Sequence, residues 1–197
     1  MNTDTPYDLI AHRWNREFRE KPFLDRFLDM ATPGSHILDL GCGSGEPIAR
    51  YLLERGFRVT GVDSSQEMLH RARACCPKGI FFLDDMMTVQ LPETYHGIVA
   101  WDSLFHVPKS NHAKLFQAMS QWLEPNSPLL LSAGGSDGEF TAPMFGVDFF
   151  YNAHAPDVFL DLLRSTGFEL VHSEFDDPSP RGHFVVICRK AARKSRS

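Results

Sequence analysis

The chain has 197 residues, 43% of them apolar, and a formal net charge of −5 at pH 7. This size favours one domain with a substantial core, and the acidic balance argues against nucleic acid as a partner. The four cysteines form no C-x-x-C pair, which argues against a zinc or iron–sulfur site. No apolar run approaches the ~20 residues of a membrane span, and the polar N-terminus does not resemble a signal peptide. We therefore expect a cytoplasmic protein, monomeric or homodimeric, with no metal and no membrane partner.

The first 32 residues are predicted to be helical. Apolar residues recur at spacings near three and four over residues 7–20, which predicts a first helix; they are Leu9, Ile10, Trp14 and Phe18. Pro22 is placed to open a second helix.

The centre of the chain is a strand, a glycine loop and a helix start, with the sequence His36-Ile37-Leu38-Asp39-Leu40-Gly41-Cys42-Gly43-Ser44-Gly45-Glu46-Pro47. The apolar run is long enough for one buried strand, and the proline suits the first turn of a helix. Because the loop has few side chains, its backbone can approach a ligand closely, and the free N–H groups at the helix start point at that ligand.

The spacing of the glycines indicates which ligand. A dinucleotide loop needs Gly-x-Gly-x-x-Gly, whereas Glu46 stands here where the last glycine would be. A carboxylate at that place would repel a pyrophosphate, which disfavours an NAD oxidoreductase. Residues 38–45 resemble the first motif of class I S-adenosylmethionine (SAM) dependent methyltransferases of the small-molecule type. The resemblance implies that Asp39, Gly41 and Gly43 bind SAM, whose sulfonium and amino groups are cationic.

A second strand is predicted over residues 57–62, and Asp63 follows it 20 residues after Gly43. An acid at this distance, at a strand end, can accept both hydroxyls of a ribose. The alternative is that Asp63 only caps the helix that follows. We expect Asp63 and its neighbour Ser64 to bind the cofactor.

A third short, buried strand is predicted over residues 80–83, before Asp84-Asp85-Met86-Met87. The resemblance implies an acid here that accepts from the adenine amino group, followed by a residue whose backbone N–H meets the ring. By register, Asp85 and Met86 take these positions. Asp84 is an alternative acid, and Met86 could instead be a flexible core residue.

A fourth strand, over residues 97–101, ends at Trp101, which is a further candidate for cofactor binding. Residues 102–108 resemble the fourth motif of the family, in which small-molecule enzymes often carry a histidine at the position of His106. Since histidine titrates near neutral pH, His106 is the candidate catalytic base. The alternative is a structural histidine packed beside Pro108.

Residues 134–152 follow a fifth strand and are too aromatic to be disordered. We expect a substrate-side insertion here, in which Phe149 and Tyr151 form the acceptor pocket together with Tyr7 and Trp14. The alternative is that these aromatic residues only extend the core. For residues 1–32, the resemblance implies a helical lid over the cofactor, and the alternative is a cap on the core.

Strands that alternate with helices predict an α/β fold with a doubly wound, mostly parallel sheet and helices on both faces. The resemblance implies seven strands with a reversed last strand. Residues 168–175 and 183–189 are expected to pair antiparallel at one sheet edge, joined by the turn Pro178-Ser179-Pro180. Residues 190–197 are expected to fray, and residues 1–197 to form a single domain.

The resemblance implies methyl transfer from SAM, with S-adenosylhomocysteine as product, to an N, O or S nucleophile of a small molecule. Two alternatives are a SAM-binding or sensing protein without catalysis, and a methyltransferase that acts on a protein or RNA. The acidic net charge and the small size of the expected insertion over residues 134–152 favour a small acceptor.

Overall fold

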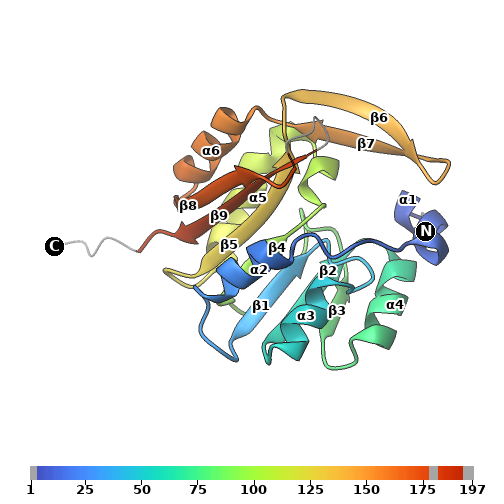
Figure 1. Cartoon of the computed structure of the whole chain (residues 1–197), viewed down its shortest axis with the longest axis horizontal. Helices are drawn as coiled ribbons and strands as arrows, with labels where there is room; N and C mark the ends of the chain where they lie inside the picture. The colour runs from blue at the N-terminus through green and yellow to red at the C-terminus, as the bar shows by residue number, and fades with distance from the viewer. Residues whose placement is uncertain (1–3, 178–181, 193–197) are drawn as a thin grey trace.

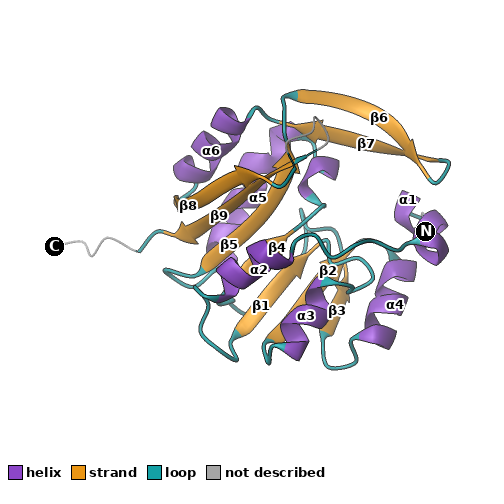
Figure 2. Ribbon diagram, viewed as in Figure 1, coloured by secondary structure: helices purple, strands orange, loops and turns teal. Residues whose placement is uncertain are grey.

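A seven-stranded sheet forms the centre of the molecule (Figures 1 and 2). The structure is a computed structural model, and it describes residues 4–177 and 182–192. The strand order is β3-β2-β1-β4-β5-β9-β8. The first five strands run parallel, and β9 runs antiparallel to both of its neighbours. The expected α/β sheet with a reversed last strand is confirmed. The strands are β1 His36–Leu40, β2 Arg58–Asp63, β3 Ile80–Leu83, β4 Ile98–Ala100, β5 Pro128–Gly134, β8 Phe168–Phe175 and β9 His183–Lys190.

Helices cover both faces of this sheet because neighbouring residues of each buried strand point to opposite sides. Ile37 packs with helices α2 and α3, whereas Leu38 packs with α5 and α6. Among the described residues, none of the helices is long and apolar enough to cross a membrane. The helices are α1 Pro6–Ile10, α2 Lys21–Leu28, α3 Ile48–Glu54, α4 Gln66–Cys75, α5 Lys109–Trp122 and α6 Pro156–Ser165, with 3-10 helices η1 Ala11–Arg13 and η2 Leu104–His106.

Strand β3 is not buried, contrary to the expectation from its apolar sequence. It is an outer strand that pairs only with β2, and the side chains of Ile80 and Phe82, which share one face, are exposed. Phe81 lies on the other face, where it packs against Leu69 and Ala72 of α4. A short apolar run therefore indicated a strand correctly but could not show whether that strand has a neighbour on each side.

The single helix expected over residues 7–20 is also wrong. The chain forms α1 and η1, and the backbone of Trp14 is then extended. Residues 14–20 form no regular structure. The guanidinium of Arg71 in α4 donates to the carbonyl oxygens of Ala11 and Trp14. Those carbonyls are thus satisfied from outside the segment, and the helix ends.

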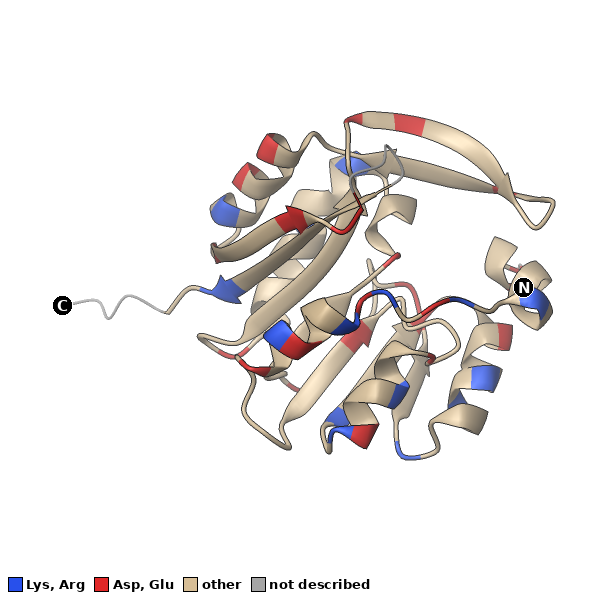
Figure 3. Ribbon diagram, viewed as in Figure 1, with Lys and Arg blue, Asp and Glu red and all other residues tan. Residues whose placement is uncertain are grey.

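The expected insertion over residues 134–152 consists mainly of a β-hairpin. Strands β6 Gly138–Met144 and β7 Val147–Ala153 pair antiparallel, and the hairpin arches over the end of the sheet (Figure 1). Phe145 and Gly146 at its turn both have positive φ, as the two-residue turns of hairpins require. The hairpin strands carry Glu139 and Asp148 but no Lys or Arg (Figure 3).

Two expectations concern residues outside the described part of the chain. The turn Pro178-Ser179-Pro180 lies there, and so do residues 193–197 of the expected tail. Lys190, which was expected to begin the frayed tail, is the last residue of β9.

The N-terminal helix is attached to the start of α4 through Asp8. One carboxylate oxygen of Asp8, Oδ1, accepts from Ser65 Oγ at 2.7 Å and from the Glu67 N–H at 3.0 Å. The other, Oδ2, accepts from the Thr5 N–H at 2.6 Å. Burial alone would raise the pKa of Asp8, but the hydrogen bonds from Glu67, Ser65 and Thr5 outweigh it and lower the pKa. Asp8 therefore joins two helix starts.

We expect Asp8→Ala to loosen α1 from α4, because each helix start loses acceptors of its free N–H groups. Loss of such a cap costs about 1 kcal/mol. Hydrogen exchange should show faster amide exchange over residues 5–13 and at Glu67, while β1 and β4 stay protected. Asp157→Ala, in the first turn of α6, is the control. Unchanged exchange over residues 5–13 would contradict this attachment.

Candidate functional site

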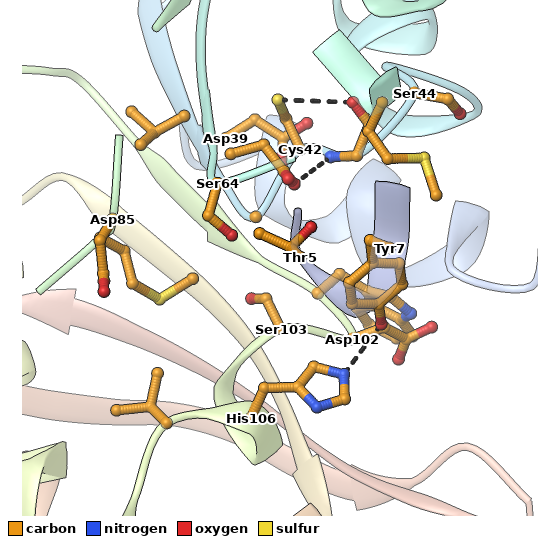
Figure 4. A pocket seen from close by; sticks show the side chains of 18 of the residues that line it. Thr5, Tyr7, Asp39, Cys42, Ser44, Ser64, Asp85, Asp102, Ser103 and His106 are labelled. Atoms are coloured by element: carbon orange, nitrogen blue, oxygen red, sulfur yellow. Dashed lines mark hydrogen bonds between the residues drawn. The ribbon is translucent and has the colours of Figure 1, made fainter. Parts of the chain in front are cut away.

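A cavity of about 390 Å³ lies at the carboxyl ends of β1, β2 and β4, beneath α1 and the β6–β7 hairpin. It brings together residues from six separate parts of the sequence (Figure 4). Its lining contains every candidate site residue except Tyr151, namely Tyr7, Trp14, Asp39, Gly41, Gly43, Asp63, Ser64, Asp85, Met86, Trp101, His106 and Phe149.

The glycine loop has backbone conformations that residues with side chains rarely adopt. Gly41 and Gly43 have φ of 73° and 52°. A Cβ atom on Gly41 would lie 2.3 Å from Cβ of Ser103, whereas a Cβ on Gly43 would meet no atom within 4 Å. Gly41 therefore allows the loop to pack on the segment after β4, and Gly43 leaves open space in the cavity wall.

Asp39 is a buried acid at the end of β1. Its side chain is 1% exposed, and its Oδ2 atom has no hydrogen-bond partner within the described part of the chain. Burial raises the pKa of Asp39 to about 7, although the positive charge of Arg16 opposes the rise. A buried, unpartnered carboxylate oxygen in a cavity wall is suited to bind a cationic group.

Asp63 connects the glycine loop to the start of α4. Its Oδ2 accepts from the Gly43 N–H at 2.7 Å, and its Oδ1 accepts from the Ser65 N–H at 2.9 Å. Burial raises the pKa of Asp63, and these backbone hydrogen bonds act against that rise. Because each carboxylate oxygen can accept more than one hydrogen bond, the contact with Ser65 does not prevent Asp63 from binding a ligand.

Asp84 and Asp85 both line the cavity after β3. The Oδ1 atom of Asp85 accepts from the Met87 N–H at 2.8 Å, and that of Asp84 accepts from the Asp85 N–H at 2.8 Å. Asp84 Oδ1 also accepts from the Thr88 hydroxyl at 3.3 Å. Both carboxylates are thus engaged in the turn, and the choice between them rests on sequence register.

His106 has hydrogen bonds at both ring nitrogens. Nδ1 is 2.7 Å from the carbonyl oxygen of Phe150, and Nε2 is 2.8 Å from the hydroxyl of Tyr7 (Figure 4). Because a carbonyl oxygen only accepts, Nδ1 carries the hydrogen, and Nε2 of the neutral ring accepts from Tyr7. Burial lowers the pKa of His106, which favours this neutral form, and it raises the pKa of Tyr7, which keeps the phenol protonated.

Phe149 and Tyr151 take different positions. Phe149 lines the cavity and packs on Tyr7, with ring centroids 4.8 Å apart. Tyr151 is not in the lining: it stacks on Phe140 across the hairpin at 5.3 Å and lies 5.1 Å from the ring of His106. Tyr151 therefore packs against the lining residue His106 without lining the cavity itself.

Arg16, Asp102 and Ser103 are among the lining residues that are absent from the expected set. Arg16 is the only Lys or Arg in the described lining, and its guanidinium pairs with Asp102 at 2.6 Å and with the buried Glu20. Asp102 has φ of 52°, which is uncommon outside glycine. Asp102 could have been found because, like Asp63, it is an acid directly after a strand. Arg16 lies in a segment that was expected to be helical, and no pattern marks it.

Comparison with known proteins identifies relatives of this chain. Residues 37–126 match the model of a methyltransferase domain family. The chain is 30% identical over 156 residues to the ubiquinone biosynthesis O-methyltransferase of Aeromonas salmonicida (strain A449). The match covers 67% of this chain and 64% of the Aeromonas protein. It spans less than two thirds of the length of the curated relatives that it matches.

Two solved structures share the fold. A SAM-dependent methyltransferase from Methanosarcina mazei superposes with a TM-score of 0.77 at 20% identity, covering 87% of this chain and 98% of that one. The 1,6-didemethyltoxoflavin-N1-methyltransferase of Burkholderia thailandensis, solved with bound 1,6-didemethyltoxoflavin and S-adenosylhomocysteine, superposes with a TM-score of 0.72 at 22% identity. That match covers 94% of this chain and 85% of the Burkholderia chain.

The two loop glycines should differ in their effect on stability. We expect Gly41→Ala to lower the free energy of unfolding by roughly 2–4 kcal/mol, because its methyl group would overlap Ser103 in addition to the cost of positive φ. Gly43→Ala should cost only about 1 kcal/mol, because space is open there. Urea unfolding of both variants measures the difference, and equal losses would mean that backbone conformation alone matters.

The raised pKa of Asp39 makes stability depend on pH. An unfolded aspartate has a pKa of about 3.9, so the folded chain binds more protons between that value and about 7. Stability should therefore fall as the pH rises through this window, by a few kcal/mol in total. In Asp39→Asn this decrease should be absent, and the variant should be more stable than the wild type at pH 8. Parallel stability curves from pH 5 to pH 8 would contradict the assignment.

Proposed function

The chain belongs to the class I SAM-dependent methyltransferases, and from that membership we propose that it transfers a methyl group from SAM to a small-molecule nucleophile. The observation that carries the proposal is the cavity in which the glycine loop and three strand-end acids meet. The acceptor atom is an N, O or S, and the product of the donor is S-adenosylhomocysteine.

The residues of the cavity fit the parts of SAM. The unpartnered Oδ2 of Asp39 suits the cationic amino-acid end of the ligand, and the open space at Gly43 accommodates it. Arg16, as the cation of the described lining, is suited to the carboxylate of the same end. Asp63 would accept the ribose hydroxyls beside Ser64, Asp85 and Met86 would bind the adenine, and Trp101 would close the floor. Among the described residues, none of the His, Cys, Asp and Glu side chains form a cluster that could hold a metal.

When bound, SAM supplies a methyl group on a positively charged sulfur, which is already activated for in-line attack. The protein then has to align the acceptor and exclude water, which can lower the barrier by roughly 7–11 kcal/mol. Tyr7, Trp14 and Phe149 form an aromatic wall of the cavity beneath α1 and the hairpin. This enclosure favours a small acceptor over a protein or RNA, as does the net charge of −5.

We expect the wild-type protein to bind SAM and Asp63→Ala to bind it at least tenfold more weakly, since each lost hydrogen bond to a charged group is worth about 1.5–3 kcal/mol. Isothermal titration calorimetry measures both affinities. Asp161→Ala, on the exposed side of α6, is the control and should bind as the wild type does. Unchanged affinity in a folded Asp63→Ala protein would remove Asp63 from the site.

Turnover separates an enzyme from a SAM sensor. The protein should convert labelled SAM to S-adenosylhomocysteine when a fractionated metabolite extract is added, and the label should appear in a small molecule. Binding of SAM with no labelled product from any fraction would support a sensor, and label in protein or RNA would support the macromolecular alternative.

A further inference from the structure

We propose that Tyr7 is a catalytic residue that takes the proton of the acceptor while it passes its own proton to His106, and that the acceptor is an aromatic hydroxyl compound. This inference rests on the proposed methyl transfer and adds a proton route and an acceptor class to it.

The hydrogen bonds of His106 leave no free nitrogen for an acceptor. Nδ1 donates to the Phe150 carbonyl oxygen, and Nε2 accepts from the Tyr7 hydroxyl. A direct role as base would require that the contact with Tyr7 breaks. The Tyr7 oxygen keeps lone pairs after it donates to Nε2, and Tyr7 lines the cavity. Tyr7 is therefore the polar group through which His106 reaches a bound acceptor.

The proton route balances without any further reactant. The acceptor hydroxyl gives its proton to the Tyr7 oxygen, and Tyr7 gives its own proton to Nε2 of His106. The acceptor oxygen forms a bond to the methyl carbon as the carbon–sulfur bond of the donor breaks, with the electron pair left on sulfur. His106 ends as an imidazolium and Tyr7 as a neutral phenol.

The surroundings of the pair suit this transient charge. The Asp102 carboxylate acts electrostatically on both groups: it raises the pKa of His106 against the larger effect of burial, and it adds to the rise that burial causes in the pKa of Tyr7. Tyr151 and Asp63 also raise the pKa of Tyr7, and Arg16 lowers it. A proton on His106 is thus stabilised by Asp102, while Tyr7 remains neutral before and after the transfer.

Both partners are held in place by buried contacts. Nδ2 of Asn152 donates to the carbonyl oxygens of Phe105 and Val107 at 2.9 and 2.8 Å, on either side of His106. Nε2 of the buried His112 is 2.9 Å from the same Val107 oxygen. Tyr7 is carried by α1, which Asp8 attaches to α4. The pair is therefore complete only while α1 covers the cavity.

Two observations select an aromatic hydroxyl as the acceptor. A neutral amine can attack a methyl group before it loses a proton, and a thiol with pKa of about 8.5 is partly ionised at neutral pH, so neither needs this route. A phenol, with a pKa of about 10, keeps its proton at neutral pH and needs a group that takes this proton as its oxygen attacks the methyl carbon. The rings of Trp14 and Phe149, on both sides of Tyr7, offer surfaces for an aromatic acceptor.

The test compares two phenols that differ in their need for a base. At about pH 8.5, 4-nitrophenol is ionised, whereas phenol, with a pKa of about 10, is not. Formation of S-adenosylhomocysteine is measured for each with wild type, Tyr7→Phe and His106→Gln. Tyr95→Phe is the matched control, because Tyr95 is a buried tyrosine before β4, beside the first residue of β1 and away from the cavity. SAM affinity is measured for each variant by calorimetry.

We expect Tyr7→Phe and His106→Gln to slow phenol methylation by about 10²-fold or more and 4-nitrophenol methylation by less than about threefold. SAM affinity should stay unchanged in Tyr7→Phe, because the ring and its packing remain. Equal losses for both phenols would make Tyr7 a structural residue. Turnover of aniline or thiophenol, but of neither phenol, would overturn the acceptor class, as would SAM binding without turnover of any of these probes. Failure of the wild type to bind SAM would instead contradict the proposed methyl transfer itself.

Discussion

The contact between Gly41 and Ser103 is the constraint on which the arrangement of the site depends. A methyl group on Gly41 would overlap Ser103, and the Ser103 hydroxyl donates to the Leu40 carbonyl oxygen at 3.0 Å. The end of β1 is thereby packed directly on the segment that leads from β4 to His106. Asp63 fixes the other side of the same loop through the Gly43 N–H. The ends of three parallel strands thus place an acid, a glycine loop and a histidine at one cavity, and these contacts fix their positions relative to one another.

The cavity is acidic, with five carboxylate side chains from Asp39, Asp63, Asp84, Asp85 and Asp102 in its lining beside Glu46. Arg16 offsets part of this charge through its pairs with Asp102 and Glu20. Arg16 belongs to the irregular segment between η1 and α2, so the same ion pairs hold that segment against the site. The cover of the cavity is therefore attached at both ends, by Asp8 at α4 and by Arg16 at Asp102.

What the sequence could predict depended on the distance over which each feature is determined. The strand, glycine loop and helix around Gly41 are set by neighbouring residues, and the spacing to Asp63 follows from one helix and one strand. These elements were predicted correctly. The exposure of β3 depends on the absence of a neighbouring strand, and the end of the first helix depends on Arg71, about 60 residues further along the chain. Local periodicity contains neither fact.

The same reasoning applies to the individual site residues. All the strand-end candidates line the cavity, because parallel strands end at one edge of the sheet. The pairing of Tyr7 with His106 joins residues 99 positions apart. Tyr151 lies outside the lining, where it stacks on Phe140 across the hairpin. The hairpin itself could not be recognised because its turn, Phe145-Gly146, carries a bulky residue at a position of positive φ where asparagine or glycine is usual.

The buried carboxyl of Asp39 has a consequence for the binding of the donor. Burial raises its pKa to about 7, so the group is partly protonated near neutral pH in the free protein. A cationic group bound beside it would favour the ionised form, and the carboxyl would then give up its proton as the ligand binds. A single unpartnered oxygen would in this way couple occupancy of the cavity to the pH of the surrounding solution.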